Sequence, residues 1–404
     1  MKHSKLINRT ISSTIIEMFQ YFPIVTLTGP RQSGKTTLCC ELFNELPYVN
    51  LEESSTLSEI QEDPTGFISK YKSGVIIDEA QNYPEIFSLL QVQVDKDRLL
   101  GNPIRHRYIV TGSNNFSLME NVTQSMAGRA AVMSLLPLSL KEILSVRPMA
   151  TTNELILNGG YPAVWSADSR GRELLLENYY TTYIERDVRR LINLKDLHAF
   201  RRFVRLCAGR IGCEVNASSL AVEVGVKTPT IQHWLSVLEA SYIIYTLPPY
   251  FANIKKRLIK SPKMYFYDTG LATHLLGISN SEQLSSHPLR GQLFENMAIN
   301  ETIKHGFNKG KNEEIYFYRD QSQREVDLMR IRPEGIEAFE IKSGLTYNSE
   351  YFKNLDYLKN LLGGQVLSTM VVYDGESENC DVSYHGFCNI RSMHNCFDRF
   401  KVQL

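Results

Sequence analysis

The sequence carries no excess charge of either sign. Its 404 residues include 44 Lys and Arg and 44 Asp and Glu, so the formal net charge at pH 7 is zero. Overall charge therefore neither indicates nor excludes a nucleic-acid partner, and local clusters of basic residues have to decide. No apolar run is as long as a membrane-spanning helix requires, so we expect no membrane partner. The basic start, Met1–Lys5, precedes no long apolar stretch and does not predict a signal peptide.

Cysteine is scarce. The chain has seven cysteines and no C-x-x-C pair, which is typical of a reducing compartment and predicts a cytoplasmic protein. Near the end of the chain, Cys380, Cys388 and Cys396 alternate with His385 and His394. Their spacing matches no zinc-binding pattern, so we interpret them as free thiols and surface histidines.

A glycine-rich segment near the start has the form G-x-x-x-x-G-K-T, at residues 29–36. The apolar run Ile24–Thr28 precedes it and indicates a buried strand, and the helix-compatible run Lys35–Phe43 follows it. Glycines let such a loop turn tightly and point its N–H groups at a phosphate, and the helix N-terminus adds positive potential. This context favours a P-loop over a simple turn before a helix.

A P-loop predicts that the chain binds ATP and Mg²⁺. We expect Lys35 to contact the β- and γ-phosphates and the Thr36 hydroxyl to ligate Mg²⁺. The predicted nucleotide-binding residues of this loop are Gly29, Pro30, Arg31, Gln32, Ser33, Gly34, Lys35, Thr36 and Thr37.

A second apolar strand, Gly74–Glu79, ends in two acids and has the form of a Walker B element. Asp78 is predicted to bind nucleotide-associated Mg²⁺, and Glu79 to orient and deprotonate the attacking water. The alternative is a strand capped by two solvated acids. Because the strand follows a P-loop, we favour the Walker B interpretation.

Two more strands complete the predicted sheet. The strand Arg107–Asn114 ends in small polar residues, and either Ser113 or Asn114 is a candidate sensor of the γ-phosphate or of the attacking water. Arg129 precedes the strand Ala130–Leu135 and is a candidate for stabilising transition-state charge, in its own subunit or in a neighbour. An ordinary salt-bridging arginine is the alternative.

Together these segments resemble the prokaryotic AAA-type ATPases of the archaeal-ATPase kind, whose C-terminal region is the domain-of-unknown-function family 4143. The resemblance implies an α/β fold with a parallel P-loop NTPase sheet of the additional-strand type, in which the sensor strand lies beside the P-loop strand. It extends from about residue 20 to about residue 345. The segments that carry it are Gly29–Thr36, Val75–Gln81, Thr111–Asn114, Ala127–Arg129 and Leu136–Ser139.

A turn-rich segment, Gly159–Pro162, matches the Gly-Gly-Tyr-Pro that opens the second half of this family. Residues 173–210 then have a helical pattern with many arginines, which either contact phosphates or form a solvated helix face. These arginines are Arg186, Arg189, Arg190, Arg201, Arg202, Arg205 and Arg210.

Residues 216–245 have the order of a helix-turn-helix: a cap at Asn216–Ser219, a turn at Gly225–Pro229 and a second helix at Thr230–Glu239. One face of the second helix is apolar and predicts a core contact through Ile231, Trp234, Leu235 and Leu238. The exposed candidates for reading DNA are Thr228, Thr230, Gln232 and His233. A basic wing is expected from Lys255, Lys256, Arg257, Lys260 and Lys263. Such modules also contact proteins or pack within their own chain, and this alternative stays open.

The last third contains the strand candidates Glu325–Arg330 and Ile336–Ser343. Period two places Glu340 and Lys342 on one face of the second strand, and Asp327 on the neighbouring strand can approach them. An acid followed by E-x-K is the arrangement of PD-(D/E)xK nucleases. Exposed strands with alternating charge produce the same pattern, but the C-terminal part of family 4143 resembles this nuclease fold.

The nuclease interpretation assigns a role to each of these residues. Asp327 and Glu340 are predicted Mg²⁺ ligands, and Glu295 on a preceding helix is a third. Lys342 is predicted to position or activate the attacking water. A polar set beside this site contacts substrate phosphate or forms a solvated loop: Arg319, Gln321, Gln323 and Arg324.

The chain is too long for one hydrophobic core. We expect an ATPase domain at 1–150, a helical linker with a winged-helix-like domain at 151–280, and an α/β nuclease-like domain at 281–404. The leading hypothesis is a Mg²⁺-dependent ATPase that acts on DNA, with metal-dependent nuclease activity as its extension. The alternatives are a nucleotide-gated switch that binds DNA or protein without cutting, and a signalling NTPase that assembles into a homo-oligomer.

Overall fold

The structure is a computed structural model that describes residues 6–71, 73–101, 107–112, 128–183, 196–250, 261–379 and 385–397. The chain forms two compact units. The first unit comprises Met1–Pro137, Ala240–Tyr242 and Phe307–Lys311, and the second comprises Leu138–Glu239, Ile243–Gly306 and Asn312–Leu404. Within the described ranges, no helix combines the length and the hydropathy that a bilayer span requires.

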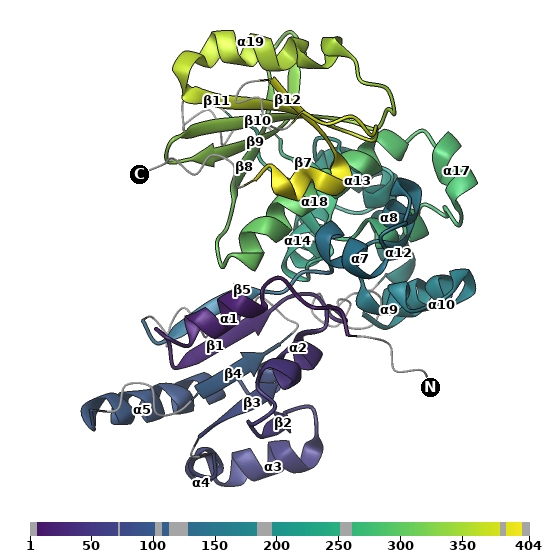
Figure 1. Ribbon diagram of the computed structural model, residues 1–404. Helices are drawn as coiled ribbons and strands as arrows, with labels where there is room; N and C mark the ends of the chain where they lie inside the picture. Colours follow the sequence, from purple (N-terminus) through teal and green to yellow (C-terminus); the bar gives the residue numbers. More distant parts are fainter. Residues whose placement is uncertain are drawn as a thin grey trace. The chain divides into compact units, whose positions relative to one another are not determined.

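The first unit is built on a five-stranded sheet in the order β2-β3-β4-β1-β5, and every neighbouring pair is parallel. Its strands are β1 (Ile24–Thr28), β2 (Tyr48–Asn50), β3 (Gly74–Asp78), β4 (Arg107–Thr111) and β5 (Ala130–Ser134). This confirms the predicted parallel sheet. Because β4 lies between β3 and β1, the predicted sensor strand is the neighbour of the P-loop strand (Figure 1).

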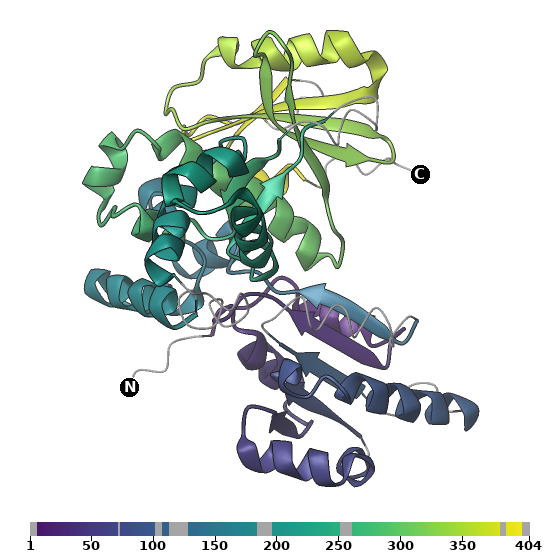
Figure 2. The same cartoon turned by 180° about the vertical axis from the view of Figure 1, so that it is seen from behind.

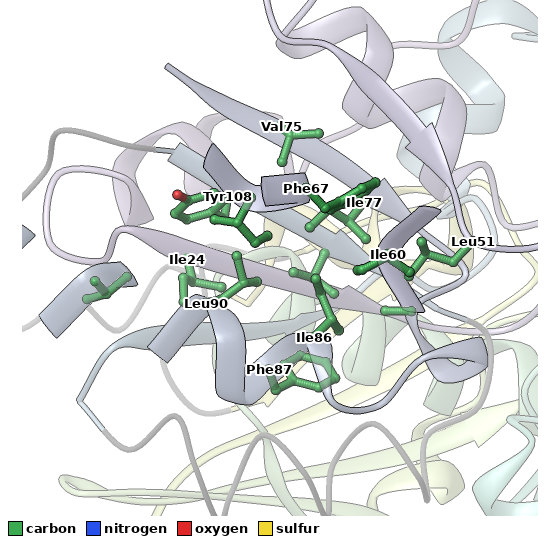
Figure 3. Close-up of a cluster of buried hydrophobic side chains, with 14 residues drawn as sticks. Ile24, Leu51, Ile60, Phe67, Val75, Ile77, Ile86, Phe87, Leu90 and Tyr108 are labelled. Atoms are coloured by element: carbon green, nitrogen blue, oxygen red, sulfur yellow. The ribbon is translucent and has the colours of Figure 1, made fainter. Parts of the chain in front are cut away.

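Helices cover both faces of this sheet, which explains why every residue of β1 and β3 is buried. Successive residues of a strand point to opposite faces: Val75 and Ile77 join one core, and Ile76 joins the other. The core that Figure 3 shows packs the sheet against α3–α5 through Ile60, Phe67 and Leu90, among others. The helices are α1 (Ser12–Met18), α2 (Lys35–Leu42), α3 (Ser54–Glu62), α4 (Pro64–Ser69), the short η1 (Ala80–Asn82) and α5 (Ile86–Leu99).

The second unit begins with helices. It contains three consecutive helices between residues 197 and 240, which we call the three-helix segment, and two strands follow them. Its helices up to residue 308 are α7 (Leu140–Val146), α8 (Thr152–Asn158), α9 (Pro162–Trp165), α10 (Ser169–Tyr179), α12 (Leu197–Ala208), α13 (Ala217–Val224), α14 (Thr228–Ala240), α16 (Thr269–Leu275), α17 (Ser281–Ser286) and α18 (Arg290–Asn308). The antiparallel strands β6 (Ile244–Leu247) and β7 (Lys263–Phe266) follow α14, and Glu214, before α13, forms a further antiparallel bridge with Lys263.

The sequence signals of this segment act as expected. The Asn216 side chain caps α13 by accepting the N–H of Ser219 at 2.9 Å, and Gly225 ends the helix in a left-handed conformation. The second helix starts at Thr228, earlier than predicted, because a helix accepts proline in its first turn and Pro229 does not delay it. Trp234 packs edge-on against Phe200 of α12, with ring centroids 5.3 Å apart.

A second five-stranded sheet lies in the last third of the chain, in the order β12-β11-β10-β9-β8. Its strands are β8 (Glu314–Arg319), β9 (Glu325–Arg332), β10 (Gly335–Lys342), β11 (Val366–Tyr373) and β12 (His385–Asn389). Strands β8, β9 and β10 are antiparallel neighbours, and β10, β11 and β12 are parallel.

A helix packs on one face of this second sheet. Both views show α19 (Lys353–Leu362) lying along one face of it, where Leu355 and Leu358 pack against Val326, Ala338 and Val371 (Figure 1, Figure 2). The remaining short turns of helix are η3 (Ser349–Phe352), η4 (Gly363–Gln365) and η5 (Ile390–Asn395). No disulfide joins the described cysteines to one another, and Cys380 lies outside the described residues.

Candidate functional site

The predicted P-loop joins the end of β1 to the start of α2. Gly29 and Gly34 have φ angles of 138° and 94°, which glycine adopts without strain. A Cβ on Gly29 would also lie 2.2 Å from the backbone oxygen of Leu135. The buried Ser33 hydroxyl has no hydrogen-bond partner. A tight loop with an unpaired buried hydroxyl fits a phosphate ligand, which accepts hydrogen bonds from such groups.

The Lys35 ammonium lies inside this loop. Its side chain is 6% exposed, and Nζ donates hydrogen bonds to the carbonyl oxygens of Gly29 at 2.9 Å and of Pro30 at 2.8 Å. Burial lowers the pKa of Lys35 to about 8, although the nearby acids Glu79 and Asp78 favour its charged form. Neutral carbonyls are weak partners for an ammonium, so the anionic oxygens of a phosphate would bind it more strongly.

The predicted cation ligands lie in direct contact. The Thr36 hydroxyl donates to Asp78 Oδ2 at 2.7 Å, and the Tyr48 hydroxyl donates to the same oxygen at 2.9 Å. Thr111, at the end of β4, donates to Asp78 Oδ1. A hydroxyl and a carboxylate are hard oxygen ligands, so this donor set fits Mg²⁺. Neither hydrogen bond from Tyr48 or Thr111 was predicted, although Thr111 belongs to a segment that carried the family resemblance.

Glu79 follows Asp78 in a left-handed conformation, with φ of 55°. Its backbone N–H donates to Asp78 Oδ1 at 3.0 Å, and the Gln81 amide donates to its carboxylate. A non-glycine residue in this conformation is strained, and such strain is typical of functional sites. The sensor candidates Ser113 and Asn114 lie outside the described residues.

Arg129 does not reach the P-loop of its own chain. Ala130 pairs with Ile24, whereas the P-loop begins after Thr28, at the other end of β1. Five residues of strand separate the two positions by roughly 16 Å, which is more than an arginine side chain spans. The Arg129 guanidinium instead donates to the Asp95 carboxylate at 2.8 and 3.0 Å. The role in its own subunit is therefore wrong for this structure, and the ordinary salt bridge is the arrangement present.

The predicted nuclease-like residues meet on β9 and β10, two neighbouring inner strands of the second sheet. Lys342 Nζ lies 2.6 Å from Glu340 Oε1 and 3.5 Å from Asp327 Oδ2. Asp327 Oδ2 also accepts the N–H of Ile341 at 2.7 Å, which fixes its position across the two strands. The second oxygen of Glu340 is buried and has no hydrogen-bond partner. The period-two argument therefore placed Glu340 and Lys342 correctly on one face.

Glu295 from α18 completes the acidic cluster, which we define as Glu295, Asp327 and Glu340. Burial and the charge of Asp327 raise the pKa of Glu295 to about 7 and that of Glu340 to about 8. The Tyr265 hydroxyl donates to Glu295 Oε1, and Lys263 Nζ lies 3.4 Å from the same oxygen. Neither β7 residue was expected at this site.

Lys263 was predicted to belong to an exposed basic wing, and this is wrong. Its side chain is 4% exposed and contacts Glu295 and Glu325, because Lys263 begins β7 and points into the unit. Burial disfavours its charge, but Glu295, Glu325 and Asp327 outweigh burial and raise the pKa of Lys263 to about 12. The other predicted wing residues lie outside the described part of the chain: Lys255, Lys256, Arg257 and Lys260.

The acidic cluster has the right donor chemistry for a hard divalent cation. The unpaired Glu340 oxygen is a further acceptor that such an ion would satisfy. Over the described ranges, however, no three acidic, histidine or cysteine side chains converge as metal ligands. The ammonium groups of Lys263 and Lys342 pair with the carboxylates instead.

A hollow of about 680 Å³ lies in the same unit, between the β8–β9 turn and the chain around Pro249 and Ser261. Arg319, Gln321 and Gln323 line it, as does Phe317. Arg319 is engaged with Glu214 at 3.1 Å. The fourth residue of the predicted polar set, Arg324, lies over the Tyr357 ring at 4.2 Å.

The apolar pattern of α14 predicted its buried residues correctly, but only two of its four predicted DNA-reading residues are exposed. The four predicted core residues of α14 are buried: Ile231, Trp234, Leu235 and Leu238. Gln232 and His233 are exposed, whereas Thr228 and Thr230 are half-buried. On α12, Arg202 and Arg205 are exposed and Arg201 is half-buried, while Arg210 pairs with Glu223. The remaining arginines of this predicted basic region lie outside the described residues: Arg186, Arg189 and Arg190.

Three families match consecutive parts of the chain. The AAA domain matches residues 21–144. A domain of unknown function, DUF8612, matches residues 149–282, and a second, DUF4143, matches residues 290–390.

Solved structures that match the chain include the Walker-type ATPase PABY2304 of Pyrococcus abyssi, which is 15% identical, covers 67% of this chain and 96% of its own, and has a TM-score of 0.41. DnaA from Aquifex aeolicus bound to AMPPCP is 13% identical, covers 58% of this chain and 89% of its own, and has a TM-score of 0.31. We draw no conclusion about ligands or partners from likenesses at these TM-scores.

Curated relatives cover most of the chain. An uncharacterized protein of Haemophilus influenzae is 22% identical over 370 residues, which cover 83% of this chain and 86% of the relative. The uncharacterized protein Rv2008c of Mycobacterium tuberculosis is 30% identical over 359 residues, which cover 88% of this chain and 77% of the relative. The chain therefore belongs to the family of Rv2008c; its first unit holds most of the match to the AAA domain, and its second unit holds most of the match to DUF4143.

Proposed function

We propose that the first unit binds and hydrolyses ATP with Mg²⁺. The observation that carries this proposal is the contact between the Thr36 hydroxyl and the Asp78 carboxylate beside a buried Lys35. Bound Mg²⁺ supplies positive charge to the β- and γ-phosphates. Thr36 and Asp78 hold the ion, and Lys35 leaves its loop carbonyls to bind the phosphates. The loop N–H groups and the Ser33 hydroxyl donate to the phosphate oxygens.

Glu79 is the proposed general base. Its carboxylate accepts a hydrogen bond from the Gln81 amide, and its backbone N–H donates one to Asp78. These two contacts hold it next to the cation ligands, where it can accept a proton from the attacking water. Glu79→Gln removes this basicity and keeps the shape, so it is expected to bind ATP with normal affinity and to lower turnover by about 100-fold or more. A variant with unchanged turnover would remove Glu79 from this role.

We also propose that α12–α14 with β6 and β7 form a winged-helix-like module that binds DNA. Three helices followed by an antiparallel pair, with the extra Glu214–Lys263 bridge, give the strand and helix order of such a module. Its exposed Arg202 and Arg205 suit phosphates, and Gln232 suits base edges. Electrophoretic mobility of a labelled duplex with Arg202→Ala/Arg205→Ala tests this: we expect weaker binding and a smaller salt dependence. Equal binding by wild type and variant would favour the protein-contact alternative.

Metal-dependent phosphodiester cleavage by the acidic cluster is the proposed extension. Asp327, Glu340 and Glu295 would hold a divalent cation, which supplies a water of lowered pKa. Lys342 is positioned to orient this water, and Arg319 in the hollow of this unit is positioned to contact a substrate phosphate. A Mg²⁺-dependent nicking assay with Asp327→Ala and Lys342→Ala tests the extension. If wild type cuts no DNA under any nucleotide, the second unit is a binding module in a nucleotide-gated switch.

A signalling NTPase that assembles into a homo-oligomer is the second candidate function. The observation that favours it is the distance of Arg129 from its own phosphate site, since only a neighbouring chain can use this arginine there. Light scattering with and without ATP measures the assembly. An unchanged mass on addition of ATP would argue against it.

A further inference from the structure

Lys263 contacts the acidic cluster although it lies on β7, which follows the three-helix segment in the sequence. It is buried, and its Nζ lies 3.4 Å from Glu295 Oε1 and contacts Glu325. It also lies 5.2 Å from the centroid of the Phe317 ring. A buried ammonium is tolerated only where carboxylates compensate for its lost hydration. Lys263 is therefore held as a counter-ion of this cluster.

Lys342 and Lys263 contact different carboxylates of the acidic cluster. Lys342 contacts Asp327 and Glu340, whereas Lys263 contacts Glu295. Each ammonium lies against oxygens that a divalent cation would use as ligands. The second oxygen of Glu340, whose residue is 4% exposed, still has no partner. The cluster thus retains acceptor capacity that its two ammonium groups do not fill.

We propose that Lys263 is a built-in competitor of the metal: its ammonium occupies Glu295 and lowers the affinity of the acidic cluster for a divalent cation. The inference rests on the metal site of the proposed function. Lys342 cannot take over this role, because it contacts the other two carboxylates. Removing the positive charge of Lys263 frees Glu295 to join Asp327 and Glu340 around one ion, and it also removes repulsion between the ammonium and that ion.

When the Lys263 ammonium is removed, its two carboxylate partners, Glu325 and Glu295, each keep another polar neighbour. Arg319 Nε lies 3.6 Å from the second oxygen of Glu325, so Glu325 keeps a cationic neighbour. The Tyr265 hydroxyl still donates to Glu295. Lys263→Met removes the ammonium that lies over the Phe317 ring and keeps an unbranched side chain of similar size there. The variant therefore changes mainly the charge that Glu295 faces.

Manganese binding tests the proposal without any assay of activity. The full chain carries Asp78→Asn, which disables the cation site of the first unit, and no nucleotide is present. Electron paramagnetic resonance measures free Mn²⁺. We expect Lys263→Met to bind Mn²⁺ about tenfold or more tightly than its parent, Lys263→Arg to bind like the parent, and Glu340→Gln added to Lys263→Met to lose the gain. A Lys263→Met variant that binds Mn²⁺ no more tightly than its parent overturns the proposal.

Melting temperatures with and without Mn²⁺ distinguish metal binding from a loss of stability in Lys263→Met. The matched control is Lys304→Met: Lys304 is 8% exposed in the same unit and pairs with Glu301 at 3.0 Å, away from the acidic cluster. Both variants are expected to melt at lower temperature, and Mn²⁺ is expected to raise the melting temperature of Lys263→Met alone. If Mn²⁺ affects the two variants equally, Lys263 is a structural counter-ion only.

The test of metal competition can fail or succeed independently of the test of nuclease activity. If wild type cuts DNA and Lys263→Met binds Mn²⁺ no more tightly than its parent, the competition is contradicted and the nuclease stays in place. Tighter Mn²⁺ binding by Lys263→Met, in a chain that cuts no DNA, supports the competition and removes the nuclease.

Discussion

The Thr36 hydroxyl donates a 2.7 Å hydrogen bond to the Asp78 carboxylate, although the two residues are 42 positions apart. Thr36 lies in the first turn of α2, and Asp78 ends β3. Parallel strands bring their carboxyl ends to one edge of the sheet, which is where α/β proteins bind ligands. The contact therefore joins the predicted phosphate loop and the predicted cation ligand in one site.

Asp78→Asn is predicted to abolish Mg²⁺-supported turnover. An amide keeps the shape of the side chain but loses the charge that attracts the cation, and it offers one acceptor oxygen to Thr36, Tyr48 and Thr111 in place of two. We expect ATP hydrolysis to fall by about 100-fold or more, measured as phosphate release. Tyr48→Phe is the control, because it removes one donor and no ligand, and it should retain activity within about threefold.

ATP affinity is predicted to depend on pH through Lys35. Its pKa in the free protein is lowered to about 8 by burial, so the ammonium loses its proton as the pH rises through this value. Bound phosphates favour the charged form and raise this pKa, so binding takes up a proton above pH 8. Affinity therefore falls as the pH rises further.

Isothermal titration of ATP at about pH 9, in buffers of different ionisation enthalpy, measures this proton uptake. Lys35→Arg supplies the control, because a guanidinium does not titrate in this range. Identical heats in all buffers for wild type would show that Lys35 keeps its proton in the free protein.

Arg129→Ala is predicted to retain turnover within about threefold while the chain is monomeric, because the strand register holds Arg129 away from its own phosphate site. Its salt bridge to Asp95 is exposed, so the loss of this pair should change stability little. Activity is measured across a range of protein concentrations. A large loss in the monomer would contradict the register argument, and a loss that appears only on association would assign Arg129 to a neighbouring site.

Trp234→Ala and Gln232→Ala are predicted to separate folding from recognition on one helix. Trp234 packs between Phe200 and Phe203, so its removal should cost about 3–5 kcal/mol in urea unfolding. Gln232 is exposed, and its removal should change stability by about 0.5 kcal/mol or less while it weakens binding to a preferred DNA sequence. A strongly destabilised Gln232→Ala would mean that this face of α14 is packed against protein.

The sequence predicted those parts of the fold that depend on local pattern. Apolar runs with glycine-rich or acidic ends predicted β1 with the loop after it and β3 with Asp78 at its end. The 3.6-residue period of α14 identified Trp234 as a core residue. Period two also placed Glu340 and Lys342 together. These features follow from residues close together in the sequence, where geometry leaves few alternatives.

The contacts that were missed or wrong depend on distant parts of the chain. Lys263 has the composition of a wing residue, and only the pairing of β7 and the position of α18 bring it to Glu295. Tyr48 lies on a short edge strand with no motif, and it reaches Asp78 because β2 pairs with β3. Arg129 is adjacent to a functional segment in the sequence, but strand direction places it at the other end of β1.

Calorimetric titration of the full chain with ATP and Mg²⁺ tests the central claim most directly, with Lys35→Ala as the matched variant. The buried ammonium is replaced by a methyl group, and the loss of a charge pair in a partly dry site corresponds to about 4 kcal/mol. We expect saturable heat with one ATP per chain for wild type and binding about 100-fold or more weaker for Lys35→Ala. The absence of heat for wild type, or equal affinities of the two proteins, would contradict it.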